Sequence, residues 1–494
     1  MNFIKKGRQT LLTGVPEGYD GAVLVAMSAD ADLILFVARD DRRMAAVADA
    51  IAFFGQDVDC ISVPAWDCLP YDRVSPRADI LARRVDALTT LSERQTGGAR
   101  AIVLTTVAAI LQRVPPPGQF AGVRLEVSLQ AGASRTRITD YLESNNFQRT
   151  ETVMEPGEYA VRGGILDLFP PGRDAPLRLD FFGDDLDSIR IFDPLSQLTT
   201  GEAETFQLEP VGEITLNDNT VERFRIGYRA LFGAASDKDI LYESVSAGRR
   251  YQGMEHWLPL FHEVLGTLFD YLPDAVVVLD HEFEAARLAR LEMISDCFEA
   301  RQSTSARGLT LMDVPYHPLP TDRLYLTEDA WSQSIDGRSV LSLRPFAGPA
   351  GAAGIEDAGG KPGRDFADVR ARPGENVYDA LRGFIDETVA GGRSVILTAL
   401  SEGSRQRFLK IAGEHGIRAT PAPDGPSNYA DSDAWLVTGG VGWDASAATT
   451  LDAALQWVAH RDRRASKTDP ADPVGDYVIG GRVVTVQAGL RHRF

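Results

Sequence analysis

The first 115 residues alternate between short apolar runs and segments in which apolar residues have helical spacing. The runs have the length of β-strands and lie at residues 22–26, 33–37 and 101–104. Residues 44–54 and 79–91 have the helical spacing and lie between the second and third runs. Strands that alternate with helices are typical of a parallel, doubly wound sheet. The sequence therefore predicts an α/β fold for this part of the chain.

Three consecutive prolines after Val114 end this first part, because proline fixes φ and lacks an N–H donor. Beyond them, residues 158–169, 177–182 and 187–192 are strand-like and are separated by Pro, Gly and Asp, and a helix is expected at 138–142. Short strands with turn residues between them are typical of antiparallel sheets. The sequence predicts an inserted α+β module here.

The remainder returns to α/β character. Residues 221–231 and 255–268 have helical spacing, and 275–279 is a buried type of strand. Residues 347–363 are rich in Gly, Ala and Pro, which indicates a flexible linker. Beyond it we expect helices at 376–389 and 403–412, strands at 394–398, 434–437 and 483–486, and a loop at 467–473. The predicted divisions are α/β parts at 1–117 and 209–335, the module at 118–208, a linker at 336–370, a small α/β domain at 371–440 and an atypical tail at 441–494.

Composition excludes several classes of protein. The net charge is −19, and such an acidic chain binds DNA tightly only where bases cluster. The densest cluster is Arg461, Arg463, Arg464 and Lys467, so we expect weak or no DNA binding by this chain alone, and protein partners instead. Three cysteines cannot form a disulfide framework, which favours a reducing, cytoplasmic location. The apolar stretches are shorter than the roughly 20 residues of a membrane span, so no membrane association is expected.

The segment 14–21 lies where an α/β ATPase carries its phosphate-binding loop. That loop has the pattern GxxxxGK[ST], whose backbone N–H groups and lysine hold the phosphates. Gly14, Gly18 and Gly21 are present, but the lysine and the hydroxyl residue are missing, and Pro16 removes one N–H donor. The sequence predicts a structural remnant that binds no nucleotide.

Acidic residues near this loop also argue against nucleotide binding. Glu17 and Asp20 place negative charge where phosphates would lie. Asp280 ends a predicted strand, but His281 follows it where an ATP-driven motor has Asp-Glu for Mg²⁺ and water. A working helicase or translocase, which is the enzymatic alternative, would need nucleotide at this loop. We therefore expect no catalysis and no cofactor on this chain.

Other catalytic patterns are missing from the sequence. His256, His262 and His281 lack the spacing of zinc ligands, and no serine lies in a GxSxG motif. No catalytic and no metal-binding residue is predicted.

Arg162, Arg178 and Phe182 are the candidate binding residues of the module. Arg178 and Phe182 lie four apart on one strand and therefore face the same side. Arginine and aromatic residues are favoured at protein interfaces and also stack on nucleic acid. Ten acidic residues but only four basic ones lie between residues 151 and 193, which argues against a phosphate-binding face. On composition alone, internal salt bridges to these acids are the favoured interpretation of the arginines.

Residues 153–170 and 177–193 closely resemble the UvrA-binding domain shared by UvrB and the transcription-repair coupling factors (Mfd). Residues 64–76 and the degenerate loop at 14–21 resemble the coupling-factor version. Residues 105–114 lead directly into the prolines, which leaves no room for the long hairpin of UvrB. The resemblance covers about residues 1–440. It implies a degenerate RecA/UvrB-like domain in two halves around the inserted module, followed by a small linking domain.

The resemblance also implies a function. In the family the module binds UvrA, through residues that correspond here to Arg162, Arg178 and Phe182, with a weaker case for Arg190. RNA polymerase binding and the ATP- and Mg-dependent motor belong to later regions, which we expect this chain to lack through a truncated, frameshifted or divergent gene. The implied role is a DNA-repair adaptor that recruits UvrA to RNA polymerase stalled at lesions. A damage-verifying DNA clamp like UvrB is the second alternative.

Overall fold

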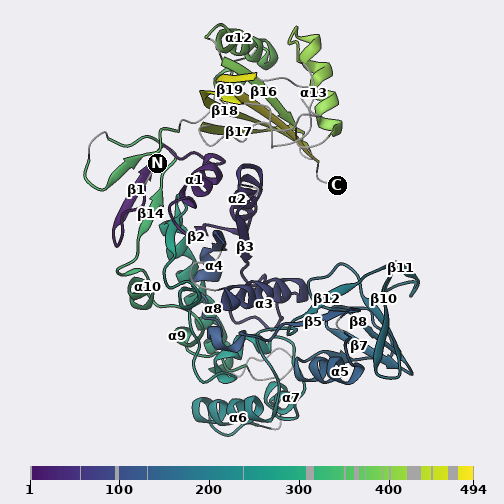
Figure 1. Ribbon diagram of the computed structural model, residues 1–494. Helices are drawn as coiled ribbons and strands as arrows, with labels where there is room; N and C mark the ends of the chain where they lie inside the picture. Colours follow the sequence, from purple (N-terminus) through teal and green to yellow (C-terminus); the bar gives the residue numbers. More distant parts are fainter. Residues whose placement is uncertain are drawn as a thin grey trace.

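The computed structural model covers the chain with several gaps. The described residues are 3–55, 57–94, 99–130, 132–236, 238–306, 316–349, 352–360, 366–372, 374–391, 393–399, 402–419, 435–446, 449–465 and 477–492. Figure 1 shows a parallel sheet with its helices, the inserted module projecting to one side, and a separate C-terminal unit. None of the described helices is both long and apolar enough to cross a membrane.

A parallel sheet forms the centre of the molecule. Its order is β15-β1-β14-β13-β2-β4-β3, and every neighbouring pair is parallel. The strands are β1 (Gln9–Thr13), β2 (Leu33–Ala38), β3 (Asp59–Val63), β4 (Ala101–Thr106), β13 (Val276–Leu279), β14 (Val340–Leu343) and β15 (Ile355–Asp357). The predicted α/β fold with a parallel sheet is confirmed for this part of the chain.

Helices cover both faces of this sheet, because its strands are apolar on both sides. In β2, Ile34 and Phe36 pack on one face while Leu35 and Val37 pack on the other. The first face is covered by α1 (Tyr19–Met27) and α2 (Asp41–Phe54). The second is covered by α3 (Ala78–Glu93), α4 (Val107–Ile110), α8 (Phe283–Ala306) and α10 (Glu328–Ile335).

Two sequence predictions in this domain were wrong. Residues 22–26, expected to form a strand, lie inside α1, which is buried through Val23, Leu24 and Met27. A short apolar run does not distinguish a buried helix from a buried strand. Residues 255–268, expected to form one helix, form the 3₁₀ helix η2 (Met254–Leu260) and the start of η3 (Leu268–Tyr271). Pro259 lacks the N–H that a continuous α-helix requires.

The predicted linker at 336–370 also differs from the structure. It contains β14, which lies between β1 and β13, and β15, which pairs with the other edge of β1. Glycine, alanine and proline suggested flexibility, but small residues here permit close packing, and Ala358 is fully buried. The short helix α11 (Ala367–Arg370) follows. The first α/β domain therefore extends about twenty residues beyond the predicted boundary at 335.

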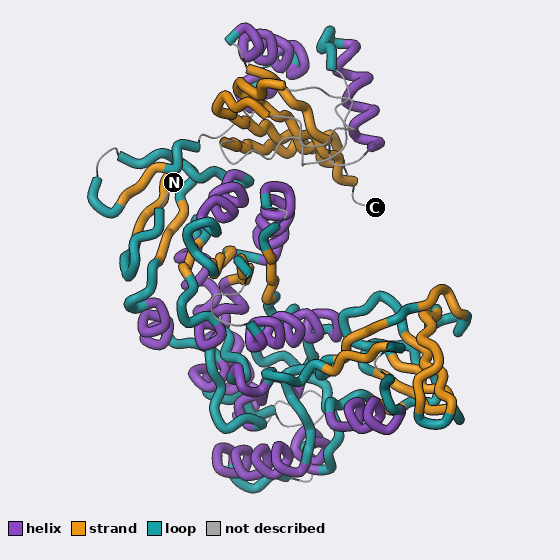
Figure 2. Tube along the Cα trace, in the orientation of Figure 1, coloured by secondary structure: helices purple, strands orange, loops and turns teal. Residues whose placement is uncertain are grey.

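The inserted module is an α+β unit, as predicted. Within it, β11-β10-β9-β8-β7-β6 form one sheet, antiparallel except for β6 with β7, and β5 pairs with β12. Helix α5 (Arg135–Ser144) lies beside the sheet (Figure 2). Its Ile138 and Leu142 are buried with the apolar residues of one face of the sheet. The strands are β5 (Leu125–Ser128), β6 (Gln148–Arg149), β7 (Glu158–Arg162), β8 (Ile165–Leu168), β9 (Leu177–Phe182), β10 (Asp185–Phe192), β11 (Thr199–Glu202) and β12 (Thr205–Leu208). The face opposite α5 carries a second, smaller buried cluster that includes Val153, Ala160 and Phe192.

Charged contacts join the two ends of the module to the body of the protein. Arg124, before β5, donates to Glu209, after β12, with an Nη2–Oε1 distance of 2.6 Å. The same guanidinium reaches Asp86 at 3.1 Å and Glu93 at 3.0 Å on α3. Burial raises the pKa of Glu209 to about 7, with a further contribution from Asp86 and opposition from Arg124. The module is thus held to α3 at its base.

A second contact at this junction is fully buried. Arg84 of α3 donates to both carboxylate oxygens of Glu213, which follows the module in the chain, and to the carbonyl of Pro64 at 2.7 Å. Both side chains are excluded from solvent. The guanidinium also lies over the ring of Trp66, 5.9 Å from its centroid. One arginine therefore connects α3, the strand end at 64 and the exit of the module.

The remaining elements lie after the module. Helices α6 (Asp218–Phe232), α7 (Ile240–Ser246) and α9 (Thr321–Leu324) pack around η2. The C-terminal unit contains α12 (Val377–Ala390), α13 (Glu402–Glu414) and the sheet β16-β19-β18-β17. Its strands are β16 (Arg393–Ala399), β17 (Trp435–Ser446), β18 (Thr449–Ala465) and β19 (Tyr477–His492). Within the predicted tail, the expected strand at 483–486 lies in β19, whereas the expected loop at 467–473 lies outside the described residues.

Candidate protein-binding face and the remnant loop

The loop between β1 and α1 binds a carboxylate of its own chain. The Oδ1 atom of Asp20 accepts hydrogen bonds from the N–H groups of Gly18 at 3.1 Å and Gly21 at 2.8 Å. Backbone N–H groups at a helix N-terminus are the groups that would bind a phosphate. Two of these donors are therefore already satisfied by an internal anion.

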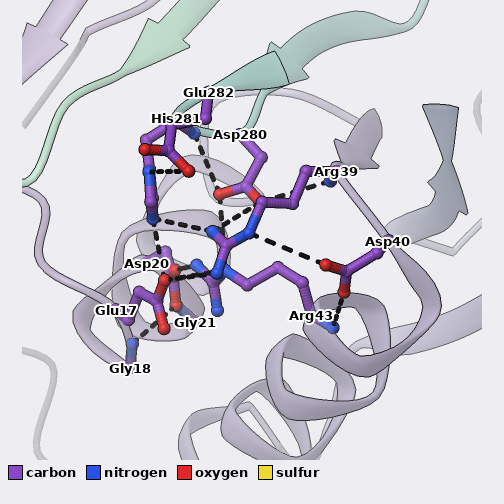
Figure 3. Close-up of polar contacts among 10 residues, drawn as sticks. All are labelled: Glu17, Gly18, Asp20, Gly21, Arg39, Asp40, Arg43, Asp280, His281 and Glu282. Carbon is purple, nitrogen blue, oxygen red and sulfur yellow. Dashed lines mark hydrogen bonds and ion pairs between the residues drawn. The ribbon is translucent and has the colours of Figure 1, made fainter. Parts of the chain in front are cut away.

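A buried arginine completes this arrangement (Figure 3). Arg43 of α2, only 4% exposed, donates from Nη2 to Asp20 and from Nε to Asp280 Oδ1 at 3.3 Å. Asp280 follows β13 and is buried as deeply as Asp20. Burial raises the pKa of Asp280, and the charge of Arg43 opposes that rise. The guanidinium thus supplies the positive charge that a lysine or a metal ion provides in a working phosphate loop.

A second, more exposed group of charges lies beside the first. Arg39 donates from Nη2 to Glu17 at 2.8 Å, and its Nη1 lies 2.7 Å from Nε2 of His281. Nε2 of His281 is also 2.7 Å from Glu17 Oε1. Burial opposes ionisation of Glu17, but the hydrogen bonds from His281 and Arg39 outweigh it and lower its pKa to about 2. The negative charge predicted here is present and is neutralised by residues of the same protein.

The loop is also covered by the segment that follows β15. Gly14 has φ of 66°, and a Cβ at this position would lie 2.4 Å from Oδ1 of Asp357. The carbonyl of Gly14 accepts from the N–H of Gly360 at 2.9 Å, and the hydroxyl of Tyr19 donates to Ala358. Glycine is required at position 14 for close packing.

In the part of the chain that the structure describes, no group of three or more His, Cys, Asp or Glu residues could hold a metal ion.

Sequence reasoning found the glycines, the two acids and Asp280, but it missed Arg39 and Arg43. Both follow β2, at the carboxyl edge of the parallel sheet where the loop also lies. Their i, i+4 spacing beside a strand end was the available signal. The GxxxxGK[ST] pattern places the positive charge on the loop itself, whereas here the positive charge comes from the end of β2 and the start of α2.

The outer face of the module's sheet carries the other candidate residues. Along β9, Leu177, Leu179 and Phe181 are buried under α5, whereas Arg178 and Phe182 point to the opposite side. Arg190 of β10 is directly opposite Arg178, and Asp167 of β8 is opposite it on the other side. The prediction that Arg178 and Phe182 share one face is therefore confirmed by strand register and burial.

A buried carboxylate organises two of the arginines. Asp167 accepts from Arg178 through Nε at 2.7 Å and Nη2 at 2.9 Å, and from Nη2 of Arg162 at 2.6 Å. Arg178 also lies over the ring of Phe192, 4.5 Å from its centroid. Its hydrogen bonds to Asp167 raise its pKa. Arg190 pairs separately with Asp180 at 2.8 Å. The internal salt bridges favoured by composition are present.

These pairings leave the candidate residues with very different access to a partner. Phe182 is 85% exposed, and the side chain of Arg162 is 51% exposed. Arg178 is only 17% exposed, and Arg190 is intermediate. Arg162 and Arg178 both bind the single carboxylate of Asp167, so these three side chains together carry one net positive charge. A cavity of about 300 Å³ lies beside it, lined by Thr152, Arg162, Ile165, Asp167, Arg178 and Gln197.

Sequence comparison adds two findings. Residues 125–213 match a family model described as the UvrB interaction domain. The chain is 33% identical over 431 residues to a transcription-repair-coupling factor of Escherichia coli, an alignment that covers 85% of this chain and 36% of the relative. It is 34% identical over 273 residues to that of Haemophilus influenzae, covering 55% of this chain and 24% of the relative. The chain therefore spans between about a quarter and a third of the length of these relatives.

Proposed function

We propose that the chain corresponds to the UvrB-like, amino-terminal part of the transcription-repair-coupling factors to which it is similar, and that it is an adaptor that binds UvrA. In this proposal the outer face of the module is the binding surface. Recruitment of UvrA to RNA polymerase stalled at DNA lesions is the biological role proposed for it. In this proposal, polymerase binding and ATP-driven translocation belong to parts of the longer relatives that the chain does not match.

The exposure of Phe182 is the observation that carries this proposal. An aromatic side chain at 85% exposure leaves most of its apolar surface in water, although burying such a side chain is worth about 1.5–3 kcal/mol. It lies on the same face as Arg162, whose guanidinium is half-exposed and aimed at a cavity. Exposed aromatic and arginine side chains on one surface are the residue types that dominate binding at protein interfaces.

The geometry distributes the roles among the four candidate residues. We propose that Phe182 enters an apolar pocket of UvrA and that Arg162 pairs with a UvrA carboxylate at the cavity. Arg178, which is less exposed than Arg162, adds positive charge to the site, because both guanidinium groups bind the same carboxylate of Asp167. Arg190, already neutralised by Asp180, contributes least.

Phe182→Ala is expected to weaken UvrA binding by more than tenfold, because an anchor of this kind is worth on the order of 2–4 kcal/mol. Isothermal titration of purified UvrA with each variant measures the effect. Ile226→Ala, an exposed apolar residue on α6, is the matched control and should bind like the parent protein. Full affinity in an Arg178→Ala, Phe182→Ala double variant would defeat the proposed function.

We further propose that the remnant loop takes no nucleotide. Asp20 accepts from two of its N–H donors, Arg43 lies between Asp20 and Asp280, and the segment after β15 covers Gly14. A triphosphate would have to displace a buried ion pair and approach Glu17, a carboxylate with a pKa of about 2.

Calorimetry with ATP and Mg²⁺ is therefore expected to give only the heat of dilution. An ATPase with an intact phosphate loop, titrated under the same conditions, provides the positive control. A saturable heat that disappears in a Gly18→Val variant would instead support the helicase or translocase alternative.

A further inference from the structure

The turn between β10 and β11 exposes two leucines. Leu195 is 82% exposed and Leu198 is 68% exposed, and Met154 from a neighbouring loop is also exposed. We call these three residues the turn patch. Leucines this exposed next to each other in a turn contribute little to the core, and polar residues would serve a turn equally well.

The turn is nevertheless firmly held. The side chain of Gln197 donates from Nε2 to the carbonyls of Pro194 at 2.7 Å and Val153 at 3.2 Å. Its backbone carbonyl and its Oε1 both accept from Arg178 at 3.3 Å. Gln197 has φ of 59°, a conformation that non-glycine residues adopt rarely unless the surroundings impose it. Arg178 is thus one of the contacts that hold the turn, and it joins the turn to β9.

The turn patch continues the proposed binding face. Gln197 lines the same cavity as Arg162 and Arg178, and its Nε2 lies 4.0 Å from the sulfur of Met154. Phe182 and Leu177 mark the two ends of β9, about 17 Å apart at roughly 3.3 Å per residue. An interface of ordinary size covers about 800 Å² on each partner, or about 28 Å across. A partner centred on this face therefore reaches both Phe182 and the turn.

We propose that the turn patch is a second apolar contact for UvrA and that Arg178 acts as a positioning residue for it. The inference rests on the proposed function, since it assigns the turn to the same partner. Phe182 and the turn patch then form apolar contacts at the two ends of the face, with the net positive charge of Arg162 and Arg178 between them. It also gives a reason why Arg178, largely buried by its own partners, matters for binding.

Replacing both leucines with serine tests the contact. Leu195→Ser, Leu198→Ser is expected to weaken UvrA binding at least tenfold in isothermal titration while leaving the melting temperature unchanged, because both side chains are exposed. Ile226→Ser, Leu288→Ser removes two exposed apolar side chains elsewhere and should retain full affinity. Full affinity in the turn variant overturns the inference. Phe182→Ala in the same series separates the two proposals. If Phe182→Ala weakens UvrA binding and the turn variant does not, the inference fails but the proposed function stands.

A double-mutant cycle tests the positioning role. If Arg178 acts through the turn, Arg178→Ala weakens binding much less in the Leu195→Ser, Leu198→Ser background than in the parent protein. Equal losses in both backgrounds would show that Arg178 acts independently of the turn, against the proposal. Analytical ultracentrifugation of the parent and the turn variant completes the test. A parent dimer that becomes monomeric in the variant would assign the patch to a second copy of this chain and overturn the inference.

Discussion

Replacing Arg43 with alanine is expected to lower the free energy of unfolding by about 3–5 kcal/mol, the cost of leaving a buried ion pair with one partner. Arg43 is the positive charge between Asp20 and Asp280, and all three side chains are almost fully buried. Without it, Asp20 loses its ion pair with Arg43, and the ion pair left to Asp280 among the described residues is the longer one with Arg39 at 3.5 Å. Urea denaturation followed by tryptophan fluorescence measures the change.

The effect of Arg43→Ala is also expected to depend on pH. Burial already raises the pKa of Asp280 in the folded protein, and loss of Arg43 raises it further. An acid whose folded pKa lies above its unfolded value destabilises the protein most when the pH is above both values, and the penalty shrinks as the pH falls through the folded pKa. The variant should therefore regain part of its lost stability, relative to the parent protein, as the pH falls through the raised pKa of Asp280.

Two control variants separate charge from packing at this position. Arg43→Met keeps most of the side-chain volume and should be nearly as destabilised as the alanine variant. Arg42→Ala removes the exposed neighbouring arginine on α2 and should change stability by less than about 0.5 kcal/mol. A loss below about 1 kcal/mol in Arg43→Ala, or one that does not vary with pH, would contradict this account of the remnant loop.

Arg84→Ala is expected to have an effect of similar size, about 3–5 kcal/mol, because it leaves the Glu213 carboxylate buried without its partner. The variant also removes the donor to the carbonyl of Pro64 and the contact with Trp66. Since Glu213 follows the module, local opening at the module's exit should accompany the loss. Hydrogen exchange should become faster in residues 209–214 and at the end of β3.

Arg83→Ala is the matched control, because Arg83 is the adjacent residue of α3 and its ion pair among the described residues is with exposed Asp79. It should change stability by no more than about 0.5 kcal/mol. The double variant Arg84→Met, Glu213→Leu replaces the pair by apolar residues and should recover much of the loss, since buried ion pairs are often replaceable by apolar groups. Unchanged exchange at 209–214 in Arg84→Ala would show that this pair does not secure the module.

Much of the candidate site followed from local patterns. Strand alternation placed Arg178 and Phe182 on one face, and the sheet register and the buried leucines of β9 agree. The missing lysine marked the loop as degenerate, and the acidic residues around Arg162 indicated internal salt bridges. Such features depend on residues close together in sequence, whose geometry the backbone period alone determines.

The remaining features depend on which distant segments meet. Arg43, Asp20 and Asp280 come from three elements, and their proximity follows from the sheet order β13-β2 with β1 nearby. The segment predicted as a linker forms β14 and β15 because both find strand partners in the sheet. β14 pairs with β1 and β13 in the interior, and β15 pairs with the other edge of β1. Residues 22–26 form part of a helix, because both sides of α1 are buried, one against the sheet and the other against α2. Composition and spacing contain none of this information.

By itself, the sequence determined the fold class, the inserted module, the incomplete GxxxxGK[ST] pattern of the loop and the shared side of Arg178 and Phe182. Tertiary structure alone decided that Asp167 holds two arginines, that Arg178 is largely covered by its own partners while Arg162 remains accessible, and that Arg43 lies between Asp20 and Asp280. The physical reason is that periodicity sets the direction of a side chain along its own element. The choice of its partner depends on strand order and register, which bring residues far apart in the chain within hydrogen-bonding distance.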